Sequence, residues 1–259
     1  SQNPVITTNP SSWESNYAWQ PSPLLDGSSL KLWYSGYNGS RFQIGLATSS
    51  DGINWSKNGS NPVVTRLSID NKDAHDPTVI KNGASYEMWY VGSDGGAASN
   101  YSVFRATSSD GINWSNSSNP VFRPSSGWGS GGISGPLVMK IGSEYKMWFS
   151  SADTGHWNIG LATSTDGISW TPYAGNPILT PTQSWEGSEV DGPTVLYNGT
   201  TYEMFYHGSG NLSYATSTDG ISWTKPADKN PILTKGASFD NNSMAGAGAV
   251  RLSNGTILL

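Results

Sequence analysis

The sequence contains no cysteine, few charged residues and no long apolar run. The lack of cysteine excludes disulfide bonds, thiolate metal sites and thiol catalysis. Charged side chains make up only 13% of the chain and its net charge is −5, so it offers no basic face for nucleic acid. No apolar stretch approaches the length of a membrane-spanning helix, and no segment repeats apolar residues at the helical period of about 3.6 residues. These absences favour an all-β protein that binds neither nucleic acid nor a membrane.

One phrase occurs four times along the chain. It reads Ala-Thr-Ser-Ser/Thr-Asp-Gly-Ile-Asn/Ser-Trp and ends at Trp55, Trp114, Trp170 and Trp223. The steps between these tryptophans are 59, 56 and 53 residues, which indicates a repeat architecture. A unit of this length is too long for one hairpin and too short for a domain, and it fits a four-stranded propeller blade.

Other features recur within each unit. An Asn-Pro pair with apolar residues follows each tryptophan, and then come a proline-initiated strand, a glycine-containing turn and an aromatic strand. β-Branched and aromatic runs between Asn, Asp and Gly pairs are typical of β-hairpins. The sequence therefore predicts one all-β domain, residues 1–259, folded as a five-bladed β-propeller with four-stranded blades. The blades are expected at 17–64, 76–122, 133–179, 189–234 and 244–259, the last together with 3–6.

The fifth unit is incomplete, because it stops within its second strand at Leu259. We expect the N-terminal strand, residues 3–6, to close the ring by pairing into this unit. Its sister repeats suggest that about 20–30 residues of a full blade are lacking. Alternatively, another chain or domain fills the gap by pairing with the open edge at 256–259.

The Asp-Gly turns of the repeated phrase are interpreted as structural, because a residue present in every unit does not mark one site. Their aspartates are expected to accept hydrogen bonds within the turn, with the following tryptophan packed between blades. The turns resemble the Asp-boxes of sialidase-type propellers, although the motif is one residue shorter. The aspartates are Asp51, Asp110, Asp166 and Asp219.

The informative residues are those that differ between the units. If the first strand of each blade runs from the top of the channel to the bottom, the residues just before it lie at the top mouth. Acidic residues gather there in the second and fourth units, while the third unit has a serine. The residues concerned are Asp73, His75, Asp76, Ser134, Glu189 and Asp191.

Aromatic and histidine side chains are expected around the same mouth. They are Trp19, Trp128, Trp185, His156 and His207. An aromatic ring stacks on the apolar face of a sugar, while carboxylates contact its hydroxyls and the glycosidic oxygen. Plainer interpretations stay open: the tryptophans pack loops, the histidines are hydrogen-bonded loop residues, Asp76 caps its strand, and the acids of the fourth unit are solvated.

One core position carries a charge. Arg105 stands where the sister units have Leu46, Leu161 and Tyr214. Because a buried arginine needs an acidic partner, we expect Arg105 to form an ion pair with a carboxylate.

The chain resembles the five-bladed propeller glycoside hydrolases, the arabinanase, xylosidase and levansucrase-like group. The matching motifs are His-Asp-Pro-Thr-Val at 75–79 and Asp-Gly-Pro-Thr-Val at 191–195. In that group a base or nucleophile Asp and an acid Glu come from alternate blades, with a modulating Asp between them. The resemblance implies that Asp76 is the base or nucleophile and Asp191 the acid, with Glu189 as its rival. Ser134 occupies the modulator's place, so the triad is incomplete.

The expected activity is cleavage of a polysaccharide or oligosaccharide by two carboxylates in the central channel. Acids that face each other across a channel leave room for a water, which favours inversion. The alternatives are a non-catalytic carbohydrate-binding propeller and an interaction scaffold of a longer surface protein, since propellers serve all three purposes. We expect a secreted or cell-surface location and assign no metal ligands, while a calcium ion in the channel is left open.

Overall fold

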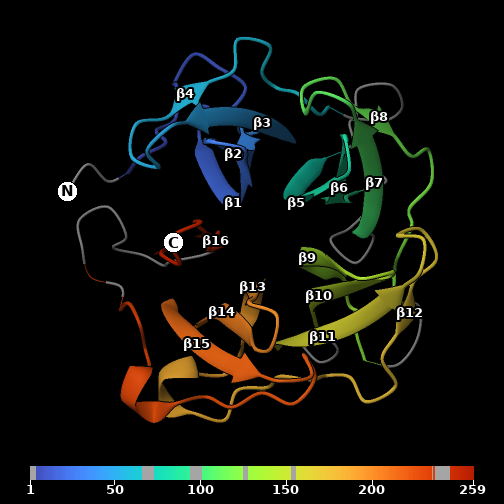
Figure 1. The fold of residues 1–259 in the computed structure, drawn as a ribbon, viewed down its shortest axis with the longest axis vertical. Helices are drawn as coiled ribbons and strands as arrows, with labels where there is room; N and C mark the ends of the chain where they lie inside the picture. The colour runs from blue at the N-terminus through green and yellow to red at the C-terminus, as the bar shows by residue number, and fades with distance from the viewer. Residues whose placement is uncertain are drawn as a thin grey trace.

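Four antiparallel sheets surround a central axis, and a smaller sheet lies between the last and the first (Figure 1). This computed structural model describes residues 4–65, 73–93, 101–124, 128–152, 156–234, 236 and 246–259. Each large sheet is one propeller blade whose first strand lies innermost, so the chain is an all-β propeller, as the repeats predict. Among the described residues, no helix is long and apolar enough to cross a membrane.

The first three blades have four strands each, joined in chain order. Blade 1 contains β1 (Tyr17–Asp26), β2 (Ser29–Tyr37), β3 (Phe42–Ser49) and β4 (Ser56–Lys57). Blade 2 contains β5 (Ala74–Asn82), β6 (Ser85–Gly92), β7 (Ser102–Ser108) and β8 (Ser115–Asn116). Blade 3 contains β9 (Ile133–Ile141), β10 (Glu144–Ala152), β11 (Trp157–Ser164) and β12 (Thr171–Pro172).

Blade 4 contains β13 (Asp191–Tyr197), β14 (Tyr202–Gly208) and β15 (Asn211–Ser217). Isolated bridges from Leu212 to Leu233 and from Thr216 to Thr224 extend its outer edge. Two short 3-10 helices flank this blade, η2 (Ser184–Glu186) and η3 (Ala227–Lys229).

The predicted fifth blade is not confirmed. The C-terminal segment forms a two-stranded antiparallel sheet of β16 (Val250–Arg251) and β17 (Ile257–Leu258). Residues 4–6 form no strand, so the expected closure by the N-terminal strand is not confirmed either. The remaining residues assigned to this blade, residue 3 and residues 244–245, lie outside the described ranges.

The Asp-Gly turns have the structural role expected of them. In blade 1, Asp51 Oδ1 accepts the backbone N–H groups of Ile53 and Asn54, each at 2.8 Å. Ser49 Oγ donates to the same oxygen at 3.0 Å. These hydrogen bonds, led by the one from the Asn54 backbone, hold the pKa of Asp51 well below its usual range. The carboxylate therefore stays ionised and fixes the turn.

Tryptophans of the second strand connect neighbouring blades. Trp33 Nε1 donates to the carbonyl oxygen of Gly111, which lies in the Asp-Gly turn of the next blade, at 3.0 Å. The same bond recurs from Trp89 to Gly167 at 2.8 Å and from Trp148 to Gly220 at 2.9 Å. All three tryptophans are fully buried. Each of the first three blades is thus fixed to its successor by a buried hydrogen bond within an apolar contact.

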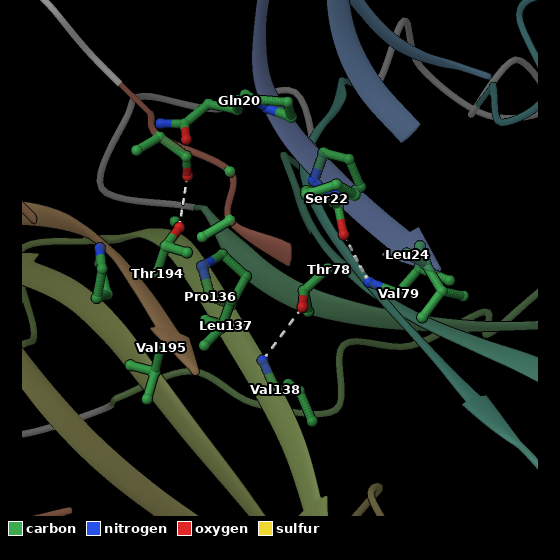
Figure 2. Close-up of a pocket in the computed structure, with 18 of the residues that line it drawn as sticks. Gln20, Ser22, Leu24, Thr78, Val79, Pro136, Leu137, Val138, Thr194 and Val195 are labelled. Atoms are coloured by element: carbon green, nitrogen blue, oxygen red, sulfur yellow. Dashed lines mark hydrogen bonds between the residues drawn. The ribbon is translucent and has the colours of Figure 1, made fainter. Parts of the chain in front are cut away.

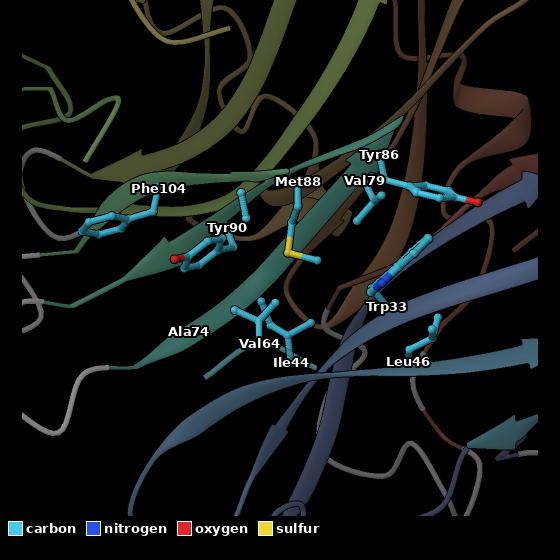
Figure 3. Packing of buried hydrophobic residues seen from close by; sticks show 11 residues of the cluster. Trp33, Ile44, Leu46, Val64, Ala74, Val79, Tyr86, Met88, Tyr90 and Phe104 are labelled. Atoms are coloured by element: carbon cyan, nitrogen blue, oxygen red, sulfur yellow. The ribbon is translucent and has the colours of Figure 1, made fainter. Parts of the chain in front are cut away.

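Figure 3 shows this junction between blades 1 and 2. Trp33, Ile44 and Leu46 of blade 1 pack in one cluster with Val79 and Met88 of blade 2. The inner strands are held in place because each hydrophobic cluster draws side chains from two successive blades.

The ion pair expected for Arg105 is confirmed. Its guanidinium Nη2 lies 3.2 Å from Glu87 Oε1, on the neighbouring strand of the same blade. The charge introduced into the blade is therefore compensated within that blade.

Replacing Trp33 with Phe should weaken the junction between blades 1 and 2. The change removes the N–H donor and part of the buried ring, so we expect a loss of about 1–3 kcal/mol in the free energy of unfolding, measured with urea. Trp114→Phe is the matched control, because the half-buried Trp114 donates to the same Gly111 oxygen from within its own blade. An equal loss in both variants would contradict a special role for the contact between blades.

Candidate functional site

In each of the four blades, a residue with a left-handed backbone lies near the start of the inner strand. The hydrogen-bond register shifts there by a β-bulge, and the residue just before the proline has a positive φ. These residues are Gln20 (49°), Asp76 (52°), Gly135 (51°) and Gly192 (59°); Gly246, ahead of the C-terminal sheet, also has a positive φ (74°). Glycine adopts this conformation freely, and other residues do so at a cost on the order of 1–3 kcal/mol. Two blades therefore retain a side chain at a position that favours glycine.

Backbone contacts with the preceding blade stabilise these strand starts. The N–H of Asp76 donates to Ser35 Oγ and that of Gly192 donates to Ser150 Oγ, both at 2.8 Å. The N–H of Ala247 donates to His207 Nε2 at 3.1 Å. In each case the acceptor is the residue that follows the Trp-Tyr, Trp-Phe or Phe-Tyr pair of the second strand.

Blade 2 breaks this pattern. Its equivalent residue is Val91, which has no acceptor in its side chain. The N–H of Gly135 donates instead to Asp76 Oδ2 at 3.0 Å. Ser134 Oγ donates to the same oxygen at 2.9 Å. The Asp76 carboxylate thus performs a contact between blades and has a fixed position at the channel.

The environment of Asp76 favours its charged form. Burial raises the pKa, but the charge of His75 and the hydrogen bonds from Gly135 and Ser134 together lower it below the ordinary value. His75 Nδ1 lies 3.0 Å from Asp76 Oδ1, although the contact is out of line for a well-formed hydrogen bond. Asp76 is therefore an ionised carboxylate at neutral pH, and it is 5% exposed.

The surroundings of Asp191 shift its pKa in the opposite direction from that of Asp76. Burial is the main cause, and the negative charges of Glu189 and then Asp76 add to it, so the pKa of Asp191 rises to about 6. Asp191 and Glu189 are both half-buried. Asp191 begins β13, two blades beyond β5, yet it lies near enough to Asp76 for their charges to interact. The site therefore combines an ionised carboxylate with a carboxyl group that keeps its proton in weakly acidic solution.

The two aspartates do not occupy equivalent positions. Asp191 pairs with His207 of β14, as His75 pairs with Val91 of β6. The structural equivalent of Asp76 is therefore Gly192, and that of Asp191 is His75. Aligning Pro77 with Pro193 in the sequence gives the same offset of one residue between the two acids.

His75 is buried among aromatic rings. Its ring centroid lies 5.1 Å from that of Phe42 and 5.1 Å from that of Tyr101, in an edge contact with Tyr101. No hydrogen bond reaches Nε2 from the described residues. Asp73, two residues earlier, accepts the backbone N–H of Phe42 at 2.9 Å. Burial, together with Asp73 and Asp76, raises the pKa of the Tyr101 phenol.

In blade 1, the predicted Trp19 lies among aromatic residues that the sequence interpretation missed, Tyr17, Tyr37 and Phe42. Trp19 stacks on Phe42 at 5.1 Å and on Tyr17 at 5.5 Å, and Tyr37 stacks on Phe42 at 4.3 Å. Tyr17 is 53% exposed. The alternating Tyr17 and Trp19 just before the first proline were the available signal, because alternate residues of a strand share a face.

The other predicted residues lie as follows. Trp128 packs against Phe149, with ring centroids 5.8 Å apart, and covers Gly160, so it fills the interior of blade 3. Trp185 is half-buried in η2, and its carbonyl oxygen accepts from Asn211. His156 is exposed, whereas His207 is buried against Gly192 and accepts from Ala247. His207 thus contacts the start of β13 at Gly192.

A cavity of about 220 Å³ extends along the axis beside Asp76. Figure 2 shows its walls, which the inner strands form. Ser22 Oγ accepts the N–H of Val79 at 3.0 Å, and Thr78 Oγ1 accepts that of Val138 at 3.2 Å. These bonds connect successive inner strands and keep the channel narrow. Among the described residues, no group of three or more His, Cys, Asp or Glu side chains is arranged to hold a metal ion.

The site can be compared with known proteins. A family model described as the glycosyl hydrolases family 32 N-terminal domain matches residues 1–129. Solved structures with the same fold include several glycoside hydrolases. The chain resembles the glycoside hydrolase propellers. This confirms the resemblance that the two strand-start motifs indicate.

Three solved structures illustrate the likeness of this glycoside hydrolase-like propeller. A glycosyl hydrolase from Bacteroides ovatus has a TM-score of 0.74 at 18% identity, covering 97% of this chain and 86% of that one. A thermostable family-43 glycoside hydrolase has a TM-score of 0.72 at 18% identity, and the match covers 92% of this chain and 81% of that one. A family 117 glycoside hydrolase from Zobellia galactanivorans has a TM-score of 0.67 at 16% identity, and the match covers 80% of this chain and 68% of that one. At such identities the likeness shows the fold alone.

Relatives are also found by sequence. Two proteins named as uncharacterized, from the CDC 1551 / Oshkosh and H37Rv strains of Mycobacterium tuberculosis, are each 29% identical over 194 residues. The match covers 71% of this chain, and the chain spans 64% of their length.

Ser134→Ala should raise the pKa of Asp76. The change removes one of the donors that stabilise the anion, so protonation becomes easier. Carboxyl-carbon NMR titration measures the shift directly. Ser150→Ala is the matched control, because Ser150 accepts the Gly192 N–H and does not contact Asp76. If the Asp76 titration is the same in wild type and both variants, the hydroxyl of Ser134 does not stabilise the charge.

Proposed function

We propose that this propeller is a glycoside hydrolase that cleaves an oligosaccharide or polysaccharide at the channel mouth. The main support is that the pKa values of two carboxyl groups from different blades are shifted in opposite directions: that of Asp76 is lowered, and that of Asp191 is raised to about 6. Paired carboxyl groups with separated pKa values are the arrangement that acid–base glycoside cleavage needs. The structurally similar proteins include glycoside hydrolases, which supports the same class.

The roles follow from the protonation states. Asp191 donates its proton to the glycosidic oxygen as the bond from that oxygen to the anomeric carbon breaks. Asp76, as the ionised partner, either takes a proton from the water that attacks the anomeric carbon or attacks this carbon itself. In the first case the water supplies the new hydroxyl group and its proton passes to Asp76. Glu189 acts on Asp191 through its charge.

Neighbouring groups fit a sugar. The stacked Trp19 and Tyr17 offer an aromatic face beside the carboxylates, and such faces pack against the C–H groups of sugar rings. His75 adds a buried ring nitrogen next to Asp76. A polysaccharide is a substrate that an enzyme meets outside the cell, so we keep secretion or cell-surface attachment as part of the proposal.

We also propose that β16 and β17 are the inner strands of a fifth blade. Gly246 has the left-handed backbone of the other strand starts, with φ 74°. The N–H of the next residue, Ala247, donates to His207 of blade 4, one position later than the contact in which Gly192 donates to Ser150 of blade 3. These two features support a fivefold repeat around the channel.

Asp76→Asn should lower kcat/KM by at least about a hundredfold, because the amide can neither accept the proton of water nor attack the sugar. Release of sugar from a panel of natural and aryl glycosides measures the effect. Asp51→Asn, in the distant turn, serves as the control for a carboxylate that matters to folding alone. Unchanged activity in Asp76→Asn would contradict the proposed chemistry.

Asp191→Asn should lower activity by an amount that depends on the leaving group of the substrate. Glycosides with a poor leaving group should lose about a hundredfold or more, because their oxygen needs a proton. Aryl glycosides such as 2,4-dinitrophenyl glycosides should lose far less, because their leaving group departs as a stable anion. A uniform loss across both kinds of substrate argues against Asp191 as the acid.

Glu189→Gln should move the alkaline limb of the rate profile to lower pH. The glutamate charge raises the pKa of Asp191, so its removal favours ionisation of Asp191. Because the acid must be protonated, the pH at which the variant loses activity should be lower than the wild-type value of about 6. The profile of kcat/KM against pH measures the shift. If Glu189 were itself the acid, the variant would lose activity at every pH.

A further inference from the structure

Gln20 is the other residue that keeps a side chain at a left-handed strand start. It has φ 49° and precedes Pro21, whereas the third and fourth blades have glycine in the same place. A left-handed residue before proline is unfavourable for any side chain. Such a conformation persists where the surrounding structure enforces it, and it is frequent at ligand sites. At Asp76 the side chain explains the exception, and this raises the question of what the Gln20 side chain does.

The Gln20 side chain lies at the channel. It is half-buried and lines the same cavity as Asp76, and Figure 2 shows it at the edge of that cavity. Its Oε1 lies so close to Gly246 that a Cβ built on that glycine would be 2.2 Å away. The glutamine therefore reaches from blade 1 toward the C-terminal sheet, where the backbone leaves room only for glycine.

Among the described residues, none uses the Gln20 carboxamide to stabilise the fold. Within the described ranges, no hydrogen bond engages it. A carboxamide has two N–H donors and an acceptor oxygen and carries no charge. It therefore leaves the charges of Asp76 and Asp191 undisturbed. A sugar hydroxyl both donates and accepts, so it matches this group.

We propose that Gln20 orients the substrate by hydrogen-bonding a hydroxyl group of the sugar unit that lies across Asp76. The inference rests on the proposed glycoside hydrolase function and adds a contact from blade 1 to those from blades 2 and 4. It also accounts for the strained backbone, because glycine at this position would leave the hydroxyl without a partner.

Two variants test this role. Gln20→Gly removes the carboxamide and relieves the left-handed backbone, and Gln20→Asn keeps the amide but withdraws it by one methylene on a residue that tolerates this conformation. Kinetics on a panel of 4-nitrophenyl glycosides and binding to an immobilised oligosaccharide array are measured for both. We expect both variants to lower kcat/KM by about tenfold, mainly through KM, the scale of one uncharged hydrogen bond. The pH values at which activity rises and falls should stay those of wild type, because the substitutions alter no charge.

Ser209→Gly is the matched control. Ser209 also has a left-handed backbone, with φ 53°, but it is exposed in the hairpin turn between β14 and β15. It reports what relief of the backbone alone does to the melting temperature and to activity. We expect its kcat/KM to match that of wild type.

The outcomes separate this proposal from the proposed function. If wild type cleaves glycosides and both Gln20 variants have its KM, the Gln20 proposal is overturned while the hydrolase stands. If wild type binds oligosaccharides without cleaving them and the variants bind about tenfold more weakly, the hydrolase fails and the Gln20 contact stands. If wild type neither binds nor cleaves, both are overturned. A kcat/KM loss that Ser209→Gly shares would also overturn the role of Gln20.

Discussion

The propeller depends on one contact between neighbouring blades, the hydrogen bond from a buried indole N–H to a glycine carbonyl. The accepting glycine belongs to the Asp-Gly turn, where φ is positive; at Gly111 it is 79°. A Cβ at Gly111 would lie 2.9 Å from Trp33 Cζ2, so the same glycine provides the turn and the space for the indole. Because this contact fixes the angle between blades, it also fixes where the inner strands begin and which side chains meet at the channel.

The site arises where the repeat is broken. A serine or histidine of the second strand normally accepts the N–H of the next strand start, and Val91 cannot. Asp76 fills that role with its carboxylate and gains donors that stabilise its charge. Within the described part of the chain, no group donates a hydrogen bond to Asp191, which is instead buried near two negative charges. One backbone pattern, used in two blades, thus yields carboxyl groups with opposite proton affinities.

The sequence predicted the all-β propeller and its four-stranded blades because each Asp-Gly turn and Asn-Pro pair has a local conformational cause. Asn61, for example, bonds both the N–H and the carbonyl of Leu46 with its side chain. It also predicted that acids gather at the strand starts. It could not reveal that Val91 makes Asp76 a contact between blades, because this depends on residues far apart in the chain. The aromatic stack of Trp19 and Phe42 was missed for the same reason, since the two come from different strands. A count of five blades stays a prediction.

The second strand of blade 4 has Phe205 where its three sisters have tryptophan. A phenyl ring packs but cannot donate, so the contact after blade 4 uses other groups: the N–H of Ala247 donates to His207, and Arg251 forms an ion pair with Glu203. The side chains of this ion pair are 30% and 17% exposed, whereas the indoles of the earlier contacts are fully buried. Dissolved salt screens exposed charges and leaves a buried hydrogen bond between neutral groups unaffected. The attachment of the C-terminal sheet to blade 4 should therefore weaken as ionic strength rises, while the contacts among the first four blades keep their strength.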